Sequence, residues 1–516
     1  MRIFKSIFLS CWISLLLCAC SSDAIVDTDG ESSGVTENTL ITVYFKMPGN
    51  TVPDTRAIPN AMTRAEEEHP GTETENTVST VNLILVEATP NGGNYTYGNI
   101  AAVIKEVTPT VVSLGKKYCF TAKVSLPGGF YRIFLIANPD NSTHEMNNLK
   151  TGMTFEEFTK TLRSCSTLEQ LKNSLYSDNH FLMTNKYASD NSDITECKPG
   201  EMATVTLQMQ RAAARIDYIY NETNEDTKKN IFTTDVAPYD TDNKVRVSLT
   251  QAALFNISRS FYYFKHISAD ETADNATIDA SATEDNFVID TDWSNKEENF
   301  AQLTTEINEN TFPNIIEMPA LGADNFIKYT DFDYKGTRLF YTSENTVPTN
   351  AQLKRTCTGV LLKGEFGLDE NQDLFNGNTD ILVHNHIIYP AKKTEALDKL
   401  NEALTTEYGE KTTITENTDA ATLKSYNVQR FTRTSTTEPF VTYYPIFMRH
   451  RNNNDNNVAG PMEFSVVRNT IYRFRVKSIS GLGPDIVPED PVEKPAQIDI
   501  EVSVADWVDR EIEFDI

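Results

Sequence analysis

The segment LITVYFKM at residues 40–47 decides how the rest of the chain is interpreted. Four apolar residues alternate with polar ones in it: Ile41, Val43, Phe45 and Met47. A repeat of two predicts a β-strand with one buried face and one solvated face. Residues 48–80 follow with no periodicity, are rich in Thr, Glu, Pro and Asn, and contain Thr-Arg-Ala twice. We therefore expect a strand on an exposed linker that a protease can cut, which would leave an empty strand position in the domain.

The first twenty residues have the pattern of a signal peptide. Arg2 and Lys5 give a short positive region, and the apolar run at 7–18 is too short for a spanning helix. Residues 17–20, Leu-Cys-Ala-Cys, resemble the lipobox of bacterial lipoproteins, in which the cysteine (Cys20 here) becomes the lipidated N-terminus. An ordinary secretory signal cut nearby is the alternative. The acidic residues after Cys20 resemble the surface-export signal of Bacteroidales lipoproteins, which implies a precursor held by lipid on the extracellular face of the outer membrane.

Composition narrows the class of protein. The chain has 73 acidic and 46 basic residues, a net charge of −27, so we expect no nucleic acid partner. It has 27 Phe and 21 Tyr, and its helical amphipathic stretches are few, the clearest being 155–175 and 394–408. This balance favours β-sheet with small helical insertions.

Four cysteines follow the signal region: Cys119, Cys165, Cys197 and Cys357. None has the CxxC spacing of zinc or redox motifs. One or two disulfides are possible in an oxidising compartment, with Cys165 and Cys197 flanking a loop-rich stretch, and the pairing stays open. The apolar surroundings of Cys119 favour a small core residue.

Short apolar runs bounded by turn residues predict many strands. In the first half they lie at 81–87, 130–138, 181–184 and 204–210. In the second half they begin near residue 216 and include 245–249, 260–264, 338–342, 358–364, 383–389, 443–450, 471–479 and 498–504. Such spacing predicts a mainly β fold of two β-sandwich domains, at 65–210 and 211–516.

Several motifs together resemble the Bacteroidales fimbrillins, the subunits of type V pili, and most of all the stalk subunits of the short (minor) fimbria. They are spread over nearly the whole chain: residues 63–66 (TRAE), 131–138 (YRIFLIAN), 181–184 (FLMT), 207–215 (LQMQRAAAR), 340–346 (FYTSENT), 467–472 (VRNTIY) and 481–484 (GLGP). The resemblance implies two transthyretin-like, Greek-key sandwiches with small helical insertions. It also implies that residues 21–64 are a propeptide, removed by an arginine-specific protease at Arg64, with Arg56 as the alternative.

The end of the chain has the pattern of a second strand like that at 40–47. Within residues 508–516, apolar residues alternate with acidic ones: Val508, Ile512, Phe514 and Ile516. By the family resemblance, this is a donor strand that fills the vacated position in the next subunit, a form of β-augmentation. The alternative is that it pairs within its own sheet, as most terminal strands do.

We expect a structural subunit rather than an enzyme. The sequence shows no catalytic arrangement and no cofactor motif. His384 and His386 lie in a strand pattern and could face one side, but no third metal ligand is apparent, so no metal is expected. The expected partners are other fimbrial subunits, the maturation protease, and a receptor on host or bacterial surfaces. The alternatives are a fimbrial tip or anchor component, or a glycan-binding surface lipoprotein.

Overall fold

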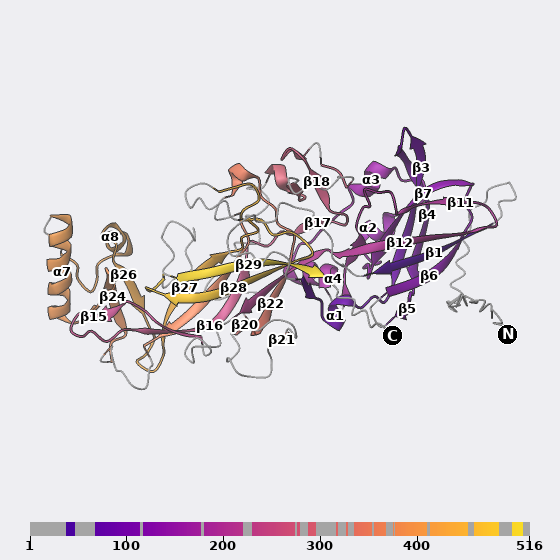
Figure 1. The fold of residues 1–516 in the computed structure, drawn as a ribbon. Helices are drawn as coiled ribbons and strands as arrows, with labels where there is room; N and C mark the ends of the chain where they lie inside the picture. The colour runs from indigo at the N-terminus through magenta and orange to yellow at the C-terminus, as the bar shows by residue number, and fades with distance from the viewer. Residues whose placement is uncertain are drawn as a thin grey trace, which may run out of the picture.

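The computed structural model describes residues 38–46, 68–113, 117–176, 180–219, 230–273, 276–278, 287–295, 316–317, 327–328, 335–352, 356–367, 375, 377–409, 413–451, 459–483 and 498–508. Its fold is mainly β, as predicted. The molecule is elongated, with a large sheet at one end, two further sheets in the middle and a small sheet beside two helices at the other end (Figure 1).

The sheet at the N-terminal end has nine strands, in the order β4-β3-β7-β10-β12-β1-β6-β5, with β11 paired to β7. Their bounds are β1 Thr39–Lys46, β3 Val81–Asn91, β4 Asn94–Val107, β5 Thr110–Ser113, β6 Lys117–Val124, β7 Gly129–Ala137, β10 Met183–Asn185, β11 Ile194–Cys197 and β12 Met202–Arg211. Strand β1 is thus an interior strand of this sheet, although it comes first in the chain.

Two sheets form the middle of the molecule. A six-stranded sheet has the order β2-β29-β28-β13-β22-β21, and a five-stranded sheet the order β14-β16-β23-β27, with β20 paired to β16. Their bounds are β2 Glu68–Pro70, β13 Ala213–Ile219, β14 Ile231–Thr233, β16 Arg246–Phe255, β20 Ile316–Glu317, β21 Ile327–Lys328, β22 Lys335–Ser343, β23 Gly359–Phe366, β27 Phe440–Phe447, β28 Thr470–Ile479 and β29 Ile498–Val508.

Smaller elements complete the fold. A four-stranded sheet has the order β15-β25-β24-β26, and two further pairs are β17-β8 and β18-β19. These strands are β8 Leu162–Ser164, β15 Ala237–Pro238, β17 Ser260–Tyr262, β18 His266–Ser268, β19 Phe287–Ile289, β24 Asp380–His384, β25 Ile387–Pro390 and β26 Gln429–Thr432, and β9 is His180–Phe181. The helices are α1 Glu73–Asn76, α2 His144–Asn148, α3 Phe155–Thr159, α4 Leu168–Tyr176, α7 Thr394–Tyr408, α8 Ala420–Ser425, and the 3-10 turns η2 Trp293–Asn295 and η3 Thr349–Ala351.

Two predicted elements differ from the structure. The helical stretch at 155–175 divides into α3, β8 and α4. The strand at 383–389 is a hairpin, because Asn385 and His386 take positive φ angles of 47° and 64° between β24 and β25. His384 and His386 therefore do not share one strand face. His384 is instead buried, with Nε2 3.0 Å from a carboxylate oxygen of Glu407.

The core consists of two large clusters and smaller ones. One large cluster contains residues of both halves of the chain, such as Phe134 and Tyr472, so apolar contacts are continuous across the predicted junction at residue 210. The other fills the nine-stranded sheet and includes Ile41, Val43 and Phe45 of β1. The four cysteines that follow the signal region are all buried and none of them forms a disulfide, so the structure contains neither of the disulfides that the sequence left open.

Candidate functional site

Strand β1 is the feature to which the predicted function points. It pairs in parallel with β12 along one side, from Leu40 opposite Met202 to Lys46 opposite Gln208. On its other side it pairs antiparallel with β6, from Thr39 opposite Val124 to Lys46 opposite Lys117. Figure 1 shows the three strands side by side at the N-terminal end of the molecule. Loss of β1 would therefore leave unpaired backbone on two strands at once, which is the condition that favours capture of another strand.

The buried face of β1 is apolar. Ile41 and Val43 are 0 % exposed and Phe45 is 1 % exposed. The Phe45 ring stacks on that of Tyr118 at a centroid distance of 5.2 Å and meets Phe120 edge-on at 6.4 Å. At about 1.5–3 kcal/mol for each buried side chain, this face makes a large contribution to folding.

The remaining contacts of β1 are polar and fix its position along the groove. The hydroxyls of Thr42 and Thr121 lie 3.0 Å apart in a hydrogen bond between neighbouring strands. The Thr39 hydroxyl donates to the carbonyl of Lys198 at 3.3 Å, and the backbone N–H of Leu40 donates to the carbonyl of Glu201 at 3.2 Å. The start of β1 is thus attached to the turn that precedes β12.

Helix α1 follows strand β2 and carries a capping box. The Thr72 hydroxyl accepts a hydrogen bond from the backbone N–H of Glu75, and a Glu75 carboxylate oxygen accepts one from the N–H of Thr72 at 2.7 Å. This reciprocal pair is the usual way to satisfy the first N–H groups of a helix. It explains how a helix of only four residues forms here.

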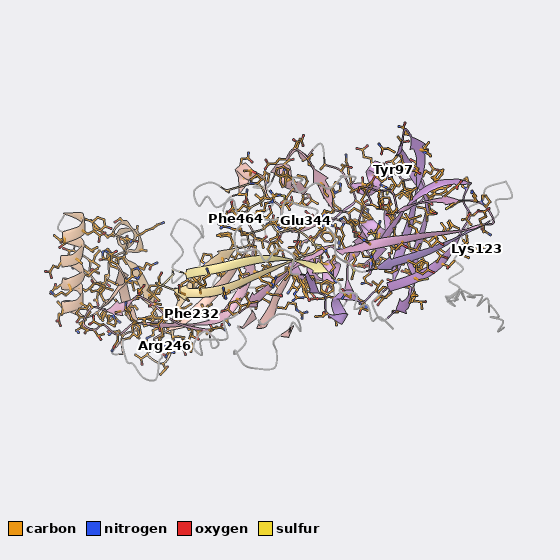
Figure 2. The ribbon with its side chains drawn as sticks, in the orientation of Figure 1. Tyr97, Lys123, Phe232, Arg246, Glu344 and Phe464 are labelled. Atoms are coloured by element: carbon orange, nitrogen blue, oxygen red, sulfur yellow. The ribbon has the colours of Figure 1, made fainter. Side chains whose placement is uncertain are left out.

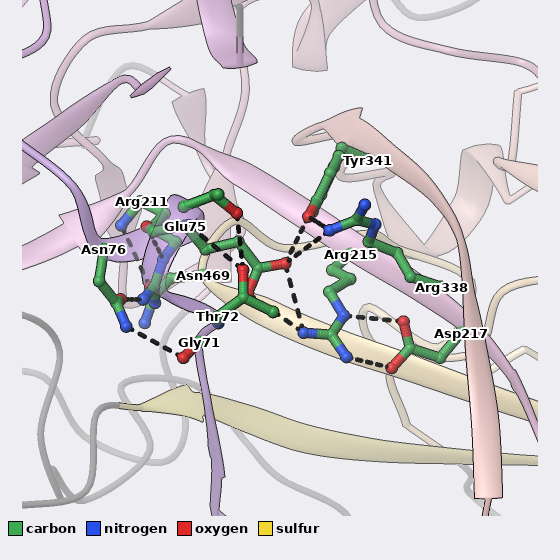
Figure 3. A network of polar contacts seen from close by, with 11 residues as sticks. Gly71, Thr72, Glu75, Asn76, Arg211, Arg215, Asp217, Arg338, Tyr341 and Asn469 are labelled. Atoms are coloured by element: carbon green, nitrogen blue, oxygen red, sulfur yellow. Dashed lines mark hydrogen bonds and ion pairs between the residues drawn. The ribbon is translucent and has the colours of Figure 1, made fainter. Parts of the chain in front are cut away.

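Glu75 also holds α1 against the six-stranded sheet (Figure 3). Its carboxylate lies 3.3 Å from Nη1 of Arg215 in β13, and it accepts a hydrogen bond from the hydroxyl of Tyr341 in β22. Arg215 is paired through two hydrogen bonds with Asp217, at 2.8 and 2.6 Å. The side chains of Glu75, Arg215 and Asp217 are all 0 % exposed.

The groups around Glu75 keep its buried carboxylate ionised. Burial alone would raise the pKa of Glu75, but Arg215, the Tyr341 hydroxyl and Arg211 together hold it below its usual value. Burial and the neighbouring Glu75 charge raise the pKa of the Tyr341 phenol, so the hydroxyl stays protonated and donates. Charge-assisted hydrogen bonds of this kind are stronger than neutral ones.

Arg211, at the end of β12, connects helix α1 to the nine-stranded sheet. Its side chain donates from Nε to the carbonyl of Glu75 at 3.1 Å and from Nη2 to the side chain of Asn76. Its backbone N–H donates to the Asn469 side chain, just before β28, at 3.1 Å. The segment behind the linker is thus anchored to the nine-stranded sheet and the six-stranded sheet together, as Figure 3 shows.

Strand β2 and the last described strand, β29, are neighbours in the six-stranded sheet. Strand β2 pairs in parallel with the end of β29, with Glu68 opposite Asp506 and Pro70 opposite Val508. The residues that shortly follow the predicted cleavage site therefore lie beside the residues that precede the predicted donor strand.

Several predicted site residues lie outside the described residues: Cys20, Met47, Arg56, Arg64, Ile512, Phe514 and Ile516. Val508 is the last described residue. Sequence reasoning missed Glu75 and Asn76, although Thr72 and Glu75 have the Thr-x-x-Glu spacing of a capping box, which could have indicated the start of a helix. Their partners did leave a signal, since Arg211, Arg215 and Asp217 are charged residues within the otherwise apolar stretch at 211–219.

Among the described residues, no group of three or more His, Cys, Asp or Glu side chains could hold a metal ion. Within the same residues, none of the helices has the length and apolar character needed to cross a membrane.

Comparison with known families gives one match. Residues 438–513 match the model of the C-terminal region of fimbrillin, the major fimbrial subunit protein type IV. This match confirms the predicted resemblance to the fimbrillins. A search of curated protein sequences returned no match.

Solved structures give distant likenesses over most of the chain. A fimbrilin from Porphyromonas gingivalis shares 14 % identity, with 91 % of this chain and 98 % of that one covered and a TM-score of 0.39. A candidate cell adhesion protein from Parabacteroides distasonis shares 13 % identity, with 90 % and 96 % covered and a TM-score of 0.41. The tip fimbrial protein of P. gingivalis, with a C-terminal truncation, shares 12 % identity, with 91 % and 100 % covered and a TM-score of 0.34.

Proposed function

We propose that this chain, which carries a fimbrillin C-terminal region, is a structural subunit of a cell-surface fimbria that mediates adhesion. The precursor is exported as a lipoprotein attached through Cys20 and cut by an arginine-specific protease at Arg64, or at Arg56. Strand β1 then leaves with residues 21–64, and the C-terminal strand of another subunit takes its place. The mature subunit would consist of two domains, at 65–210 and 211–516.

The observation that carries the proposal is the position of β1. It is an interior strand with three side chains at most 1 % exposed, yet it is joined to the rest of the chain only through residues 47–67. Once the linker is cut and β1 leaves, the backbone groups of β12 and β6 that had paired with it lose their partners, and an apolar groove lies between the two strands. Refilling the groove restores both the backbone hydrogen bonds and the buried apolar area.

The anchoring of α1 supports the same scheme. After cleavage at Arg64, the new N-terminus would begin a few residues before β2, and Glu75 and Arg211 would still hold the retained segment to both sheets. Only the strand in front of the cut is then free to leave. The retained domain keeps its shape around the groove.

The test is controlled cleavage of the purified full-length precursor. Treatment with an arginine-specific protease should yield a ladder of polymers whose subunits begin at Ala65, or at Ala57 if Arg56 is cut, as N-terminal sequencing would report. If Arg64 is the site that is cut, the Arg64→Ala variant should remain a monomer and its matched control Arg56→Ala should polymerise; the reverse result would assign the cut to Arg56. A variant that lacks residues 509–516 should be cut at the same rate without forming polymers. Clean cleavage of the full-length chain with no polymer would refute the proposal.

A further inference from the structure

We infer that Tyr118 is a positioning residue for the proposed strand exchange, on which this inference rests: its hydroxyl connects the groove of a subunit to the root of that subunit's own C-terminal tail. The root is the end of β29 that pairs with β2, residues 506–508. A subunit whose groove is filled would then hold its tail in place for the next subunit.

Tyr118 lies at the end of the groove that faces the middle of the molecule. It is near the start of β6, whereas Lys123, near the end of the same strand, lies at the outer end of the molecule (Figure 2). The Tyr118 ring packs against that of Phe45 in β1, and Tyr118 is only 6 % exposed. The strand that occupies the groove therefore covers this ring.

The hydroxyl of Tyr118 binds the backbone at the end of α1. It donates to the carbonyl of Asn76 at 3.0 Å and accepts a hydrogen bond from the N–H of Val78 at 3.2 Å. Hydrogen bonds are stronger away from water than in contact with it. With an empty groove, water would reach Tyr118, so the two bonds would persist but would hold the end of α1 less firmly.

The side chain of Asn76 connects α1 to the end of β2 (Figure 3). Its Nδ2 donates to the carbonyl of Gly71 at 3.1 Å, and Gly71 directly follows Pro70, the last residue of β2. The approach is close, because a Cβ atom at residue 71 would lie 2.8 Å from Oδ1 of Asn76 and 2.5 Å from Nη2 of Arg211. The position of the end of β2 therefore depends on that of Asn76.

Strand β2 is the neighbour of the tail root. It is only three residues long, forms the edge of the six-stranded sheet and pairs in parallel with residues 506–508. So short a strand makes few hydrogen bonds, each with a modest net contribution, and Pro70 has no N–H to donate. The contacts of α1 are thus needed to hold β2 beside the root, and a change at Tyr118 reaches the root through Asn76 and Gly71.

This connection would make polymerisation cooperative. A tail whose root is held loses less conformational freedom when it enters the next groove. A subunit within a polymer has a filled groove and is therefore a better donor than a free cleaved subunit. Because such coupling is reciprocal, a held root also favours a filled groove. We expect a lag, while free subunits join, followed by rapid growth.

Hydrogen exchange of the full-length precursor tests the connection. Tyr118→Phe removes only the hydroxyl, and should make the backbone N–H groups of residues 68–69 and 506–508 exchange about three- to tenfold faster. The matched control is Tyr131→Phe in the same sheet, which removes a hydrogen bond of 2.8 Å to the carbonyl of Pro127 and should leave these groups unchanged. Equal exchange at the root in the wild-type and Tyr118→Phe proteins would overturn the inference.

Asn76→Ala interrupts the same connection one step further on. It removes the side-chain bond to Gly71 but keeps the carbonyl that Tyr118 contacts. If the two residues act in series, Tyr118→Phe should have no further effect on exchange at the root in the Asn76→Ala protein. A full additional effect in that protein would contradict the connection through Asn76.

The time course of polymerisation separates this inference from the proposed function. Enough arginine-specific protease is added to complete cleavage at the start, and growth is followed by light scattering. Wild type and Tyr131→Phe should show the lag and rapid growth, whereas in Tyr118→Phe the ratio of the rapid rate to the initial rate should be lower by about threefold or more. Curves of the same shape for all three proteins would overturn the inference and leave strand exchange intact. No polymer from the cleanly cut wild-type protein would instead refute the proposed function.

Discussion

Phe45 of β1 stacks on Tyr118 of β6, with ring centroids 5.2 Å apart and an angle of 10° between the rings. The hydroxyl of the same Tyr118 donates to the carbonyl of Asn76 at 3.0 Å and accepts a hydrogen bond from the N–H of Val78 at 3.2 Å. One side chain thus contacts both the strand in front of the linker and the segment behind it. If β1 leaves as proposed, the hydrogen bonds of Tyr118 to Asn76 and Val78 would remain and would keep its side chain in place for an incoming strand.

Phe45→Ala should destabilise the precursor by about 3–5 kcal/mol, because it removes a buried ring and leaves a cavity. Urea denaturation of the uncleaved protein measures this. Leu40→Ala is the matched control on the exposed face of the same strand, and should cost less because Leu40 is 39 % exposed. After cleavage and polymerisation, Phe45→Ala should have no effect, since β1 is absent from the polymer. A persistent effect would mean that the strand stays bound.

Glu75→Gln should destabilise the protein by about 3–5 kcal/mol, because it leaves the buried Arg215 without one of its two carboxylate partners. The control is Lys160→Ala, which removes the exposed ion pair with Glu156 and should cost about 0–1 kcal/mol. The loss of unfolding free energy caused by Glu75→Gln should therefore be several times the loss caused by Lys160→Ala. Similar values for both variants would show that the anchor of α1 contributes little.

His450 should make stability depend on pH. Its Nδ1 lies 2.9 Å from the hydroxyl of Tyr472, and burial, with repulsion from Arg451 and Lys265, lowers its pKa to about 3 from the usual 6.5. The unfolded chain therefore binds a proton at this residue below about pH 6.5, while the folded chain does not until about pH 3. The contribution of neutral His450 is complete above pH 6.5 and decreases as the pH falls, by at most about 1.4 kcal/mol per pH unit.

The matched variant for this dependence is His450→Gln, which keeps a polar group near Tyr472 but does not titrate. Carboxylates lower stability in acid in both proteins, so the quantity to follow is the difference in unfolding free energy between them. We expect this difference to be constant above about pH 7 and to shift in favour of the variant at lower pH. A difference that does not change from pH 7 to pH 4 would contradict the assignment.

Local sequence patterns predicted the strands and helices whose own residues have a regular apolar repeat. The alternation at 40–47 predicted β1, and the amphipathic stretch at 394–408 coincides with α7. The hairpin of β24 and β25 was missed because its turn depends on positive φ at Asn385 and His386, which no apolar pattern reveals. The anchor at Glu75 was missed for another reason: its partner Arg215 lies 140 residues away, and only the folded sheets bring them together.

Cys119 offers a direct probe of the empty groove. It is 0 % exposed and its register partner across the β1–β6 pair is Tyr44, so the thiol should react slowly with alkylating reagents in the precursor. Cleavage should produce a short-lived stage in which β1 has left and Cys119 reacts fast, and polymerisation should protect it again. Pulsed alkylation followed by mass spectrometry measures this, with the buried Cys357 of the second half as the internal control. In a variant without residues 509–516, Cys119 should stay reactive because no tail refills the groove. Unchanged protection of Cys119 at every stage would mean that β1 never leaves.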